Sequence, residues 1–241
     1  MLEIAYMSIA DINDERRERL YSCIDPKRRE QLQQRRNRKS ADQSLAAEAL
    51  ARVMLLQTVR KIEAEKRNAG DCIPDDFLYS GGKPGVLQAK DFVIIRDGNE
   101  KPYQATVPGL YFNCSHSGDM VACAVADVEV GVDIQEIVEN PKVKERIFCP
   151  QELKGDFCFT EIWTKKESYI KYTGEGLRRD MASLYVQKMQ EDGEVNWFGG
   201  TVCDTCYLYA CVAPDVKMQE SGWKMHEITL SEVLQAICES R

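Results

Sequence analysis

The chain has 241 residues, of which 44% are hydrophobic and 29% charged, and its formal net charge is −7. This length suits one large domain or two of about 120 residues, and either can bury a core. The sequence has no apolar run long enough to cross a bilayer, and its first residues are too charged for a signal peptide. We therefore expect a cytoplasmic protein with no membrane partner.

A basic helix is expected near residue 26, because Asp25 can act as the N-cap and Pro26 occupies the first helical position. Between Lys27 and Lys39 lie seven basic residues and one acid. Such a run is usually a solvated helix face. A nucleic-acid site is disfavoured, because the run has no interleaved aromatic residues. The remaining interpretation is attraction to phosphates and to an acidic protein partner.

Two longer helices are expected, at about residues 40–67 and 160–172, because apolar residues recur there at helical spacing. Strand-rich chain follows each helix, and segment 120–127 resembles segment 208–215. A short helix is expected at 230–238. These repeated patterns predict an α+β fold in which two similar halves, residues 1–128 and 129–241, pack about a pseudo-twofold axis with a ligand cleft between them.

The ten cysteines are scattered through apolar segments, which indicates buried thiols rather than a disulfide framework. Cys203 and Cys206 have a spacing that suits zinc or a redox dithiol. Only Cys211 is available as a third ligand, and residues 206–212 have the pattern of a core strand. We therefore expect no metal at this pair.

Candidate site residues lie in two later segments. Asp133 and Gln135 share one face of the expected strand 131–135, and a buried acid such as Asp133 is costly unless it is paired or bound to metal. Glu167 and Lys171 are four residues apart on one helical face, which alone would indicate an exposed salt bridge. Together with His116 in a run of small polar residues, they suggest metal-assisted chemistry on a phosphate ester.

Four motifs, in this order along the chain, resemble those of the Sfp-type 4′-phosphopantetheinyl transferases. They are GGKPGV at 81–86, NCSHSG at 113–118, GVDIQ at 131–135 and WTKKESYIKYTGEGL at 163–177. The family moves the phosphopantetheine arm of coenzyme A onto a serine of a carrier protein. The resemblance thus implies this activity, Mg²⁺ or Mn²⁺ as cofactor, coenzyme A as co-substrate and an acidic apo carrier protein as partner. It also implies the two-halved fold in a monomer. No nucleic acid is expected as a partner, because the chain has no nucleic-acid-binding motif.

The resemblance also implies the roles of residues in the C-terminal half. Asp133, Glu167 and Gln135 would be metal ligands, with Glu167 as general base and Lys171 orienting Glu167 and stabilising the transferred phosphoryl group. Many members have a second acid where this chain has Gln135. The Gln135 amide oxygen can ligate the metal, or a water can take that place.

The N-terminal half would hold the nucleotide. By the resemblance, Ser115 and His116 contact the coenzyme A phosphates, and Lys83 and Pro84 contact the nucleotide end. Gln43 stands where an arginine often binds the 3′-phosphate, which leaves other basic residues for that role. The candidates are Arg28, Arg38 and Lys39. The rival hypothesis is a non-catalytic protein that binds coenzyme A or carrier proteins with the same fold.

Overall fold

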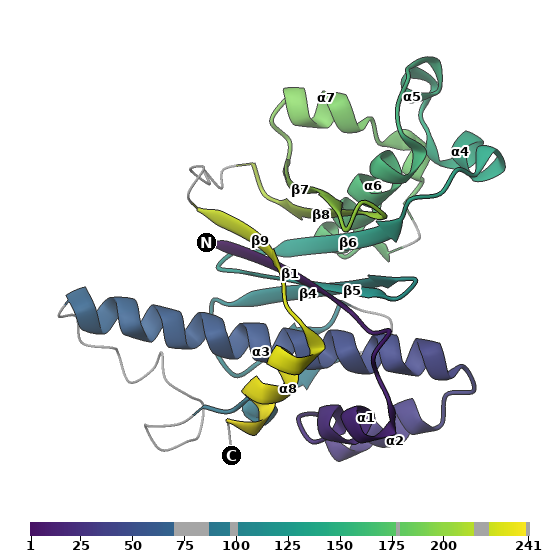
Figure 1. The fold of residues 1–241 in the computed structure, drawn as a ribbon. Helices are drawn as coiled ribbons and strands as arrows, with labels where there is room; N and C mark the ends of the chain where they lie inside the picture. Colours follow the sequence, from purple (N-terminus) through teal and green to yellow (C-terminus); the bar gives the residue numbers. More distant parts are fainter. Residues whose placement is uncertain (70–86, 97–100, 177–178, 215–221, 240–241) are drawn as a thin grey trace.

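The computed structural model describes residues 1–69, 87–96, 101–176, 179–214 and 222–239. Within them the chain has the predicted α+β fold. Two sheets lie in the middle of the molecule, and helices cover their outer faces (Figure 1). None of the described helices is long and apolar enough to span a membrane.

The first sheet has four strands in the order β4-β5-β1-β9. Strand β1 pairs antiparallel with β5 and parallel with β9, and β4 pairs antiparallel with β5. The bounds are Leu2–Ser8 for β1, Tyr111–Ser117 for β4, Met120–Ala126 for β5 and Trp223–Glu227 for β9. Strands β2 (Ile94–Ile95) and β3 (Tyr103–Gln104) form a separate ribbon that follows the turn η2 (Ala89–Asp91).

Helix α3 (Arg38–Ala69) runs along the outer face of the first sheet and supplies much of its core (Figure 1). The apolar residues that predicted this helix are buried, because they recur on the face toward the sheet. They are Leu45, Ala49, Val53, Leu56 and Val59. Helices α1 (Asp14–Tyr21), α2 (Pro26–Gln33) and α8 (Leu230–Cys238) pack against α3.

The second sheet has three antiparallel strands in the order β6-β8-β7. Their bounds are Val130–Glu136 for β6, Asn196–Val202 for β7 and Cys206–Val212 for β8. Helix α6 (Phe159–Thr173) lies on the outer face of this sheet, against β6 and β8. The shorter elements beside it are α4 (Pro141–Ile147), α5 (Pro150–Lys154), the turn η4 (Met181–Ser183) and α7 (Val186–Glu191).

The two sheets repeat one connectivity. In each, a strand is followed by helices and then by a hairpin whose second strand pairs with the first strand, giving the orders β4-β5-β1 and β7-β8-β6. Their inner faces pack together through buried side chains such as Ile4, Ala124, Val132 and Leu208. This repetition supports two similar halves. The pseudo-twofold axis and the division between residues 128 and 129 stay predictions.

One part of the predicted division is wrong. Strand β9 and helix α8, which we assigned to the half 129–241, lie with the first sheet and its core. Strand β9 pairs with the edge of β1, whose backbone groups would otherwise lack a partner. Helix α8 buries Leu230, Val233 and Leu234 in the core formed around α3. The C-terminal segment therefore closes the first half rather than extending the second.

Candidate active site

Strands β4 and β6 lie next to each other where the two sheets meet. Side chains of β4 at every second position contact β6, because the strand period is two. Asn113 Oδ1 accepts a hydrogen bond from the Val132 N–H at 2.9 Å, and Ser117 Oγ accepts one from the Glu136 N–H at 3.1 Å. The NCSHSG segment thus satisfies backbone donors of β6 and joins the two halves.

Asp133 lies at the centre of this junction and is 1% exposed. Its Oδ1 accepts hydrogen bonds from Ser115 Oγ and Lys171 Nζ, each at 2.6 Å. Its Oδ2 accepts one from Gln135 Nε2 at 3.1 Å. Lys171 Nζ also donates to Ser115 Oγ at 2.8 Å. The buried charge is therefore fully paired, and residues from β4, β6 and α6 meet in one network.

Gly131 allows α6 to approach the strand that carries Asp133. A Cβ atom at Gly131 would lie 2.1 Å from the carbonyl oxygen of Ser168 and 2.2 Å from the backbone nitrogen of Tyr172. Both atoms belong to the α6 backbone, which cannot move aside as a flexible side chain can. The absence of a side chain at Gly131 therefore sets the distance at which Lys171 reaches Asp133.

We expect Gly131→Ala to destabilise the fold by about 1–3 kcal/mol, because the added methyl group overpacks the contact between β6 and α6. Gly200→Ala on β7 is the matched control, since a Cβ there meets no atom within 4 Å. Urea unfolding of the two variants measures the difference. Equal free energies of unfolding would show that α6 does not depend on Gly131.

Glu167 lies on the same face of α6 as Lys171, one turn earlier, as the spacing predicts. Burial raises the pKa of the Glu167 carboxyl, and the negative charge of Asp133 raises it further, while Lys171 opposes the shift. The Asp133 carboxylate on β6 therefore interacts electrostatically with the Glu167 carboxyl on α6. A cation bound between the two carboxylates would reduce the repulsion between their negative charges.

The residues of this junction fit a magnesium ion. Among the described residues there is no group of three or more histidine, cysteine, aspartate or glutamate side chains arranged to hold a metal. Two carboxylates are sufficient for Mg²⁺, which is usually bound by one or two carboxylates together with waters and substrate phosphates. Asp133 and Glu167 would hold the ion. The CxxC pair at Cys203 and Cys206 remains two free thiols.

A cavity of about 170 Å³ adjoins the network on the β4 side, and Ser115 and His116 line it. Desolvation lowers the pKa of His116, and the positive charge of Lys171 lowers it further. Arg28 of α2 and Arg96 also line this cavity. A nucleotide contact by Arg28 stays a prediction, and Arg96 was not among the residues predicted from the sequence. No motif surrounds Arg96, which directly follows the short strand β2.

The buried acid Glu48 of α3 fixes both arginines. Its Oε2 accepts from Arg28 Nε at 3.1 Å and from Arg96 at 2.8 Å, and its Oε1 pairs with Arg52 at 3.1 Å. One carboxylate thus faces three guanidinium groups. The pKa of Arg96 is lowered by burial and also by the charges of Arg28 and Arg52. Two of these guanidinium groups, those of Arg28 and Arg96, line the cavity together with Glu48.

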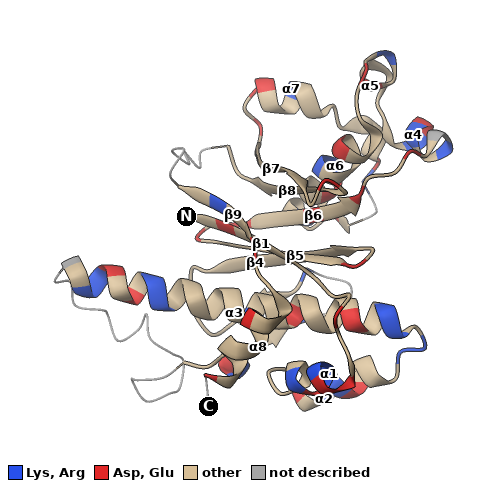
Figure 2. Ribbon diagram, in the orientation of Figure 1, with Lys and Arg blue, Asp and Glu red and all other residues tan. Residues whose placement is uncertain are grey.

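Two other predicted nucleotide contacts, Arg38 and Lys39, do not join this cavity. Arg38 pairs with Asp14, and Lys39 pairs with Asp119 at 2.8 Å, and neither lines the cavity. Basic residues are spread over α1, α2 and the start of α3 rather than gathered on one face of one helix (Figure 2). Lys83 and Pro84 lie outside the described residues.

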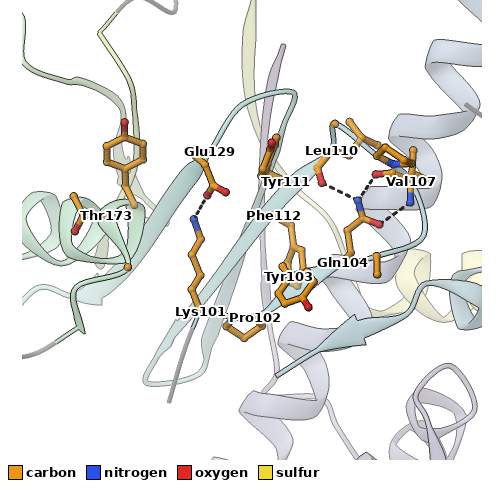
Figure 3. A pocket seen from close by; sticks show the side chains of 15 residues that line it. Lys101, Pro102, Tyr103, Gln104, Val107, Leu110, Tyr111, Phe112, Glu129 and Thr173 are labelled. Carbon is orange, nitrogen blue, oxygen red and sulfur yellow. Dashed lines mark hydrogen bonds and ion pairs between the residues drawn. The ribbon is translucent and has the colours of Figure 1, made fainter. Parts of the chain in front are cut away.

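A larger cavity of about 780 Å³ lies beyond Phe112, along β3, β4 and the C-terminus of α6. Figure 3 shows the ion pair of Lys101 with Glu129 beside it and the hydrogen bonds that Gln104 makes to the neighbouring backbone. None of the carboxylates of the network lines this cavity. The larger cavity is therefore separate from the network around Asp133.

Comparison with known proteins identifies sequence relatives of this chain. A family model described as the 4′-phosphopantetheinyl transferase superfamily matches residues 129–210, which include both Asp133 and Glu167. The 4′-phosphopantetheinyl transferase psf-1 of Bacillus pumilus is 34% identical over 45% of this chain and 51% of its own length. The 4′-phosphopantetheinyl transferase Sfp of Bacillus subtilis (strain 168) is 26% identical over 86% of this chain and 85% of its own length.

A mammalian relative, the L-aminoadipate-semialdehyde dehydrogenase-phosphopantetheinyl transferase of Mus musculus, is 31% identical over 72% of this chain and 55% of its own length. The chain thus spans about half the length of several of the relatives it matches. Residues 129–210 thus match the 4′-phosphopantetheinyl transferase superfamily. The similarity to Sfp extends over most of both chains.

Proposed function

We propose that this protein transfers the 4′-phosphopantetheine arm of coenzyme A to a serine of an apo carrier protein and releases 3′,5′-ADP. The observation that carries the proposal is the network of Ser115, Asp133 and Lys171, with Glu167 one helical turn away. Coenzyme A and an acidic carrier protein are the proposed partners. The protein would act as a monomer in the cytoplasm, without nucleic acid or membrane.

Each residue of the network has a task that follows from its position. Glu167, whose pKa is raised by burial and by Asp133, would accept the proton of the carrier serine. Lys171 would donate hydrogen bonds to the transferring phosphoryl oxygens, and Ser115 and His116 would hold the pyrophosphate. Asp133 and Glu167 would hold Mg²⁺ or Mn²⁺, and the family resemblance implies Gln135 as a third ligand. When bound, the ion neutralises negative charge that develops on the phosphates.

The decisive experiment incubates the protein with coenzyme A, Mg²⁺ and a panel of apo carrier proteins. We expect mass spectrometry to show that a carrier gains one phosphopantetheine arm on its serine. EDTA should stop the reaction, and excess Mg²⁺ should restore it. A panel without any mass gain, with either Mg²⁺ or Mn²⁺, would favour the rival hypothesis of a non-catalytic protein that binds coenzyme A or carrier proteins.

The nucleotide end of coenzyme A would lie in the cavity beside His116, with its 3′-phosphate near Arg28 and Arg96. We expect Arg96→Ala to raise KM for coenzyme A by roughly 10–100-fold, because a hydrogen bond to a charged group is lost. KM for 3′-dephospho-coenzyme A should stay unchanged. Arg38→Ala is the matched control, since Arg38 pairs with Asp14 away from the cavity. A larger effect of Arg38→Ala would put the 3′-phosphate elsewhere.

A further inference from the structure

Gln135 shares one face of β6 with Asp133 and has two hydrogen-bond partners. Its Nε2 donates to Asp133 Oδ2 at 3.1 Å, and its Oε1 accepts from Ser117 Oγ at 3.2 Å. Ser117 Oγ in turn accepts from the Glu136 N–H at 3.1 Å. A hydroxyl has one proton, and Ser117 can give that proton to Gln135 while the Glu136 N–H occupies one of its lone pairs.

These partners determine which end of the Gln135 amide faces Asp133. With the amide turned over, its oxygen would face the Asp133 carboxylate, and neither oxygen carries a proton. The observed orientation satisfies Ser117, Gln135 and Asp133 together. The amide oxygen is therefore directed toward Ser117, and the N–H group toward the carboxylate.

We infer that Gln135 is a positioning residue that donates a hydrogen bond to Asp133, and that its amide oxygen is not a metal ligand. The inference rests on the proposed function, because the metal is part of that proposal. It gives a reason for an amide at this position. A glutamate here would have no proton to donate to Asp133 and would add a third negative charge beside Asp133 and Glu167.

NMR of the side-chain amides tests this role without measuring activity. The Gln135 resonances can be assigned by comparing wild type with Gln135→Met. We expect a downfield Nε2 proton in the wild type that is retained in excess Mg²⁺ and moves upfield in Ser117→Ala, because the hydroxyl that orients the amide is lost. A Mg²⁺-dependent shift of the Gln135 side-chain carbonyl carbon would overturn the inference, since ligation through oxygen produces that shift.

Kinetics give an independent test. We expect Gln135→Met to lower kcat by about tenfold while KM for coenzyme A and the Mg²⁺ concentration for half-maximal rate change by less than about threefold. Ser117→Ala should also lower kcat. Ser231→Ala, on the exposed face of α8, should have the kcat of the wild type. A tenfold or greater loss of Mg²⁺ affinity in Gln135→Met would overturn the inference. If wild type transfers nothing, the proposed function fails, and the NMR result still decides the role of the amide.

Discussion

Removing the charge of either carboxylate is expected to lower the rate of transfer by about a hundredfold or more, because each would leave a divalent ion without one of its two charged side-chain ligands. The variants are Asp133→Asn and Glu167→Gln, which keep the shape of the side chain. Asp133→Asn also leaves Lys171 without its ion-pair partner. Turnover of an apo carrier protein, followed by mass spectrometry at saturating coenzyme A, measures the effect.

Glu161→Gln is the matched control for Glu167→Gln. It lies on the same helix, but its carboxylate pairs with Lys165 and Tyr209 instead of facing Asp133. Turnover of Glu161→Gln should stay within about threefold of wild type, because the side chain does not face the proposed metal. A fully active Asp133→Asn enzyme with unchanged Mg²⁺ dependence would remove the metal from this junction.

The sequence was sufficient to predict the elements that carry the proposed site. The strand period put Asp133 and Gln135 on one face of β6, and the helical period put Glu167 and Lys171 on one face of α6. The structure brings these two faces together, and the ends of α6 differ from the expected helix by a single residue. Both patterns are local, so a sequence without alignment reveals them.

The approach of α6 to β6 could not be predicted in the same way. Gly131 is the first residue of the GVDIQ motif and lies within β6. A glycine in a strand can mark a bulge or a close approach of another backbone. Its meaning here depends on Ser168 and Tyr172, which lie about 40 residues later in the chain. Contacts at that separation leave no local signature.

The basic run between Lys27 and Lys39 shows a similar limit. The helix start at Pro26 was predicted correctly from its N-cap and its proline. The directions in which the basic side chains point were not predicted. Arg28 of α2 pairs with Glu48 of α3, whereas Lys39 of α3 pairs with Asp119 of the β4–β5 hairpin. A buried glutamate on an apolar helix face was the one available signal for the arginine cluster. Arg96 itself could be found only from the structure.

Disrupting the buried ion pair of Lys166 with Glu152 is expected to lower the free energy of unfolding more than any other change considered. Lys166 and Glu152 are both 0% exposed, and Lys166 Nζ lies 2.5 Å from Glu152 Oε2. The ammonium also donates to the carbonyl oxygens of Ile147 and Met181, and the carboxylate accepts from the N–H groups of Cys149 and Val186. Burial lowers the pKa of Lys166, and the Glu152 carboxylate opposes this shift. The pair therefore ties α5, η4 and α7 to α6 directly beside Glu167.

We expect Lys166→Met to lower the free energy of unfolding by about 3–5 kcal/mol, because it leaves the Glu152 charge buried without a partner. The double variant Lys166→Met/Glu152→Gln should recover part of that loss, since the amide is neutral and its oxygen can still accept from Cys149. Lys188→Met, which removes an exposed pair with Asp192, should cost less than about 1 kcal/mol. Urea unfolding of the three variants measures these differences. If Lys166→Met were no less stable than Lys188→Met, the buried pair would not be what anchors α6, and the position of Glu167 would have to depend on the contact at Gly131 instead.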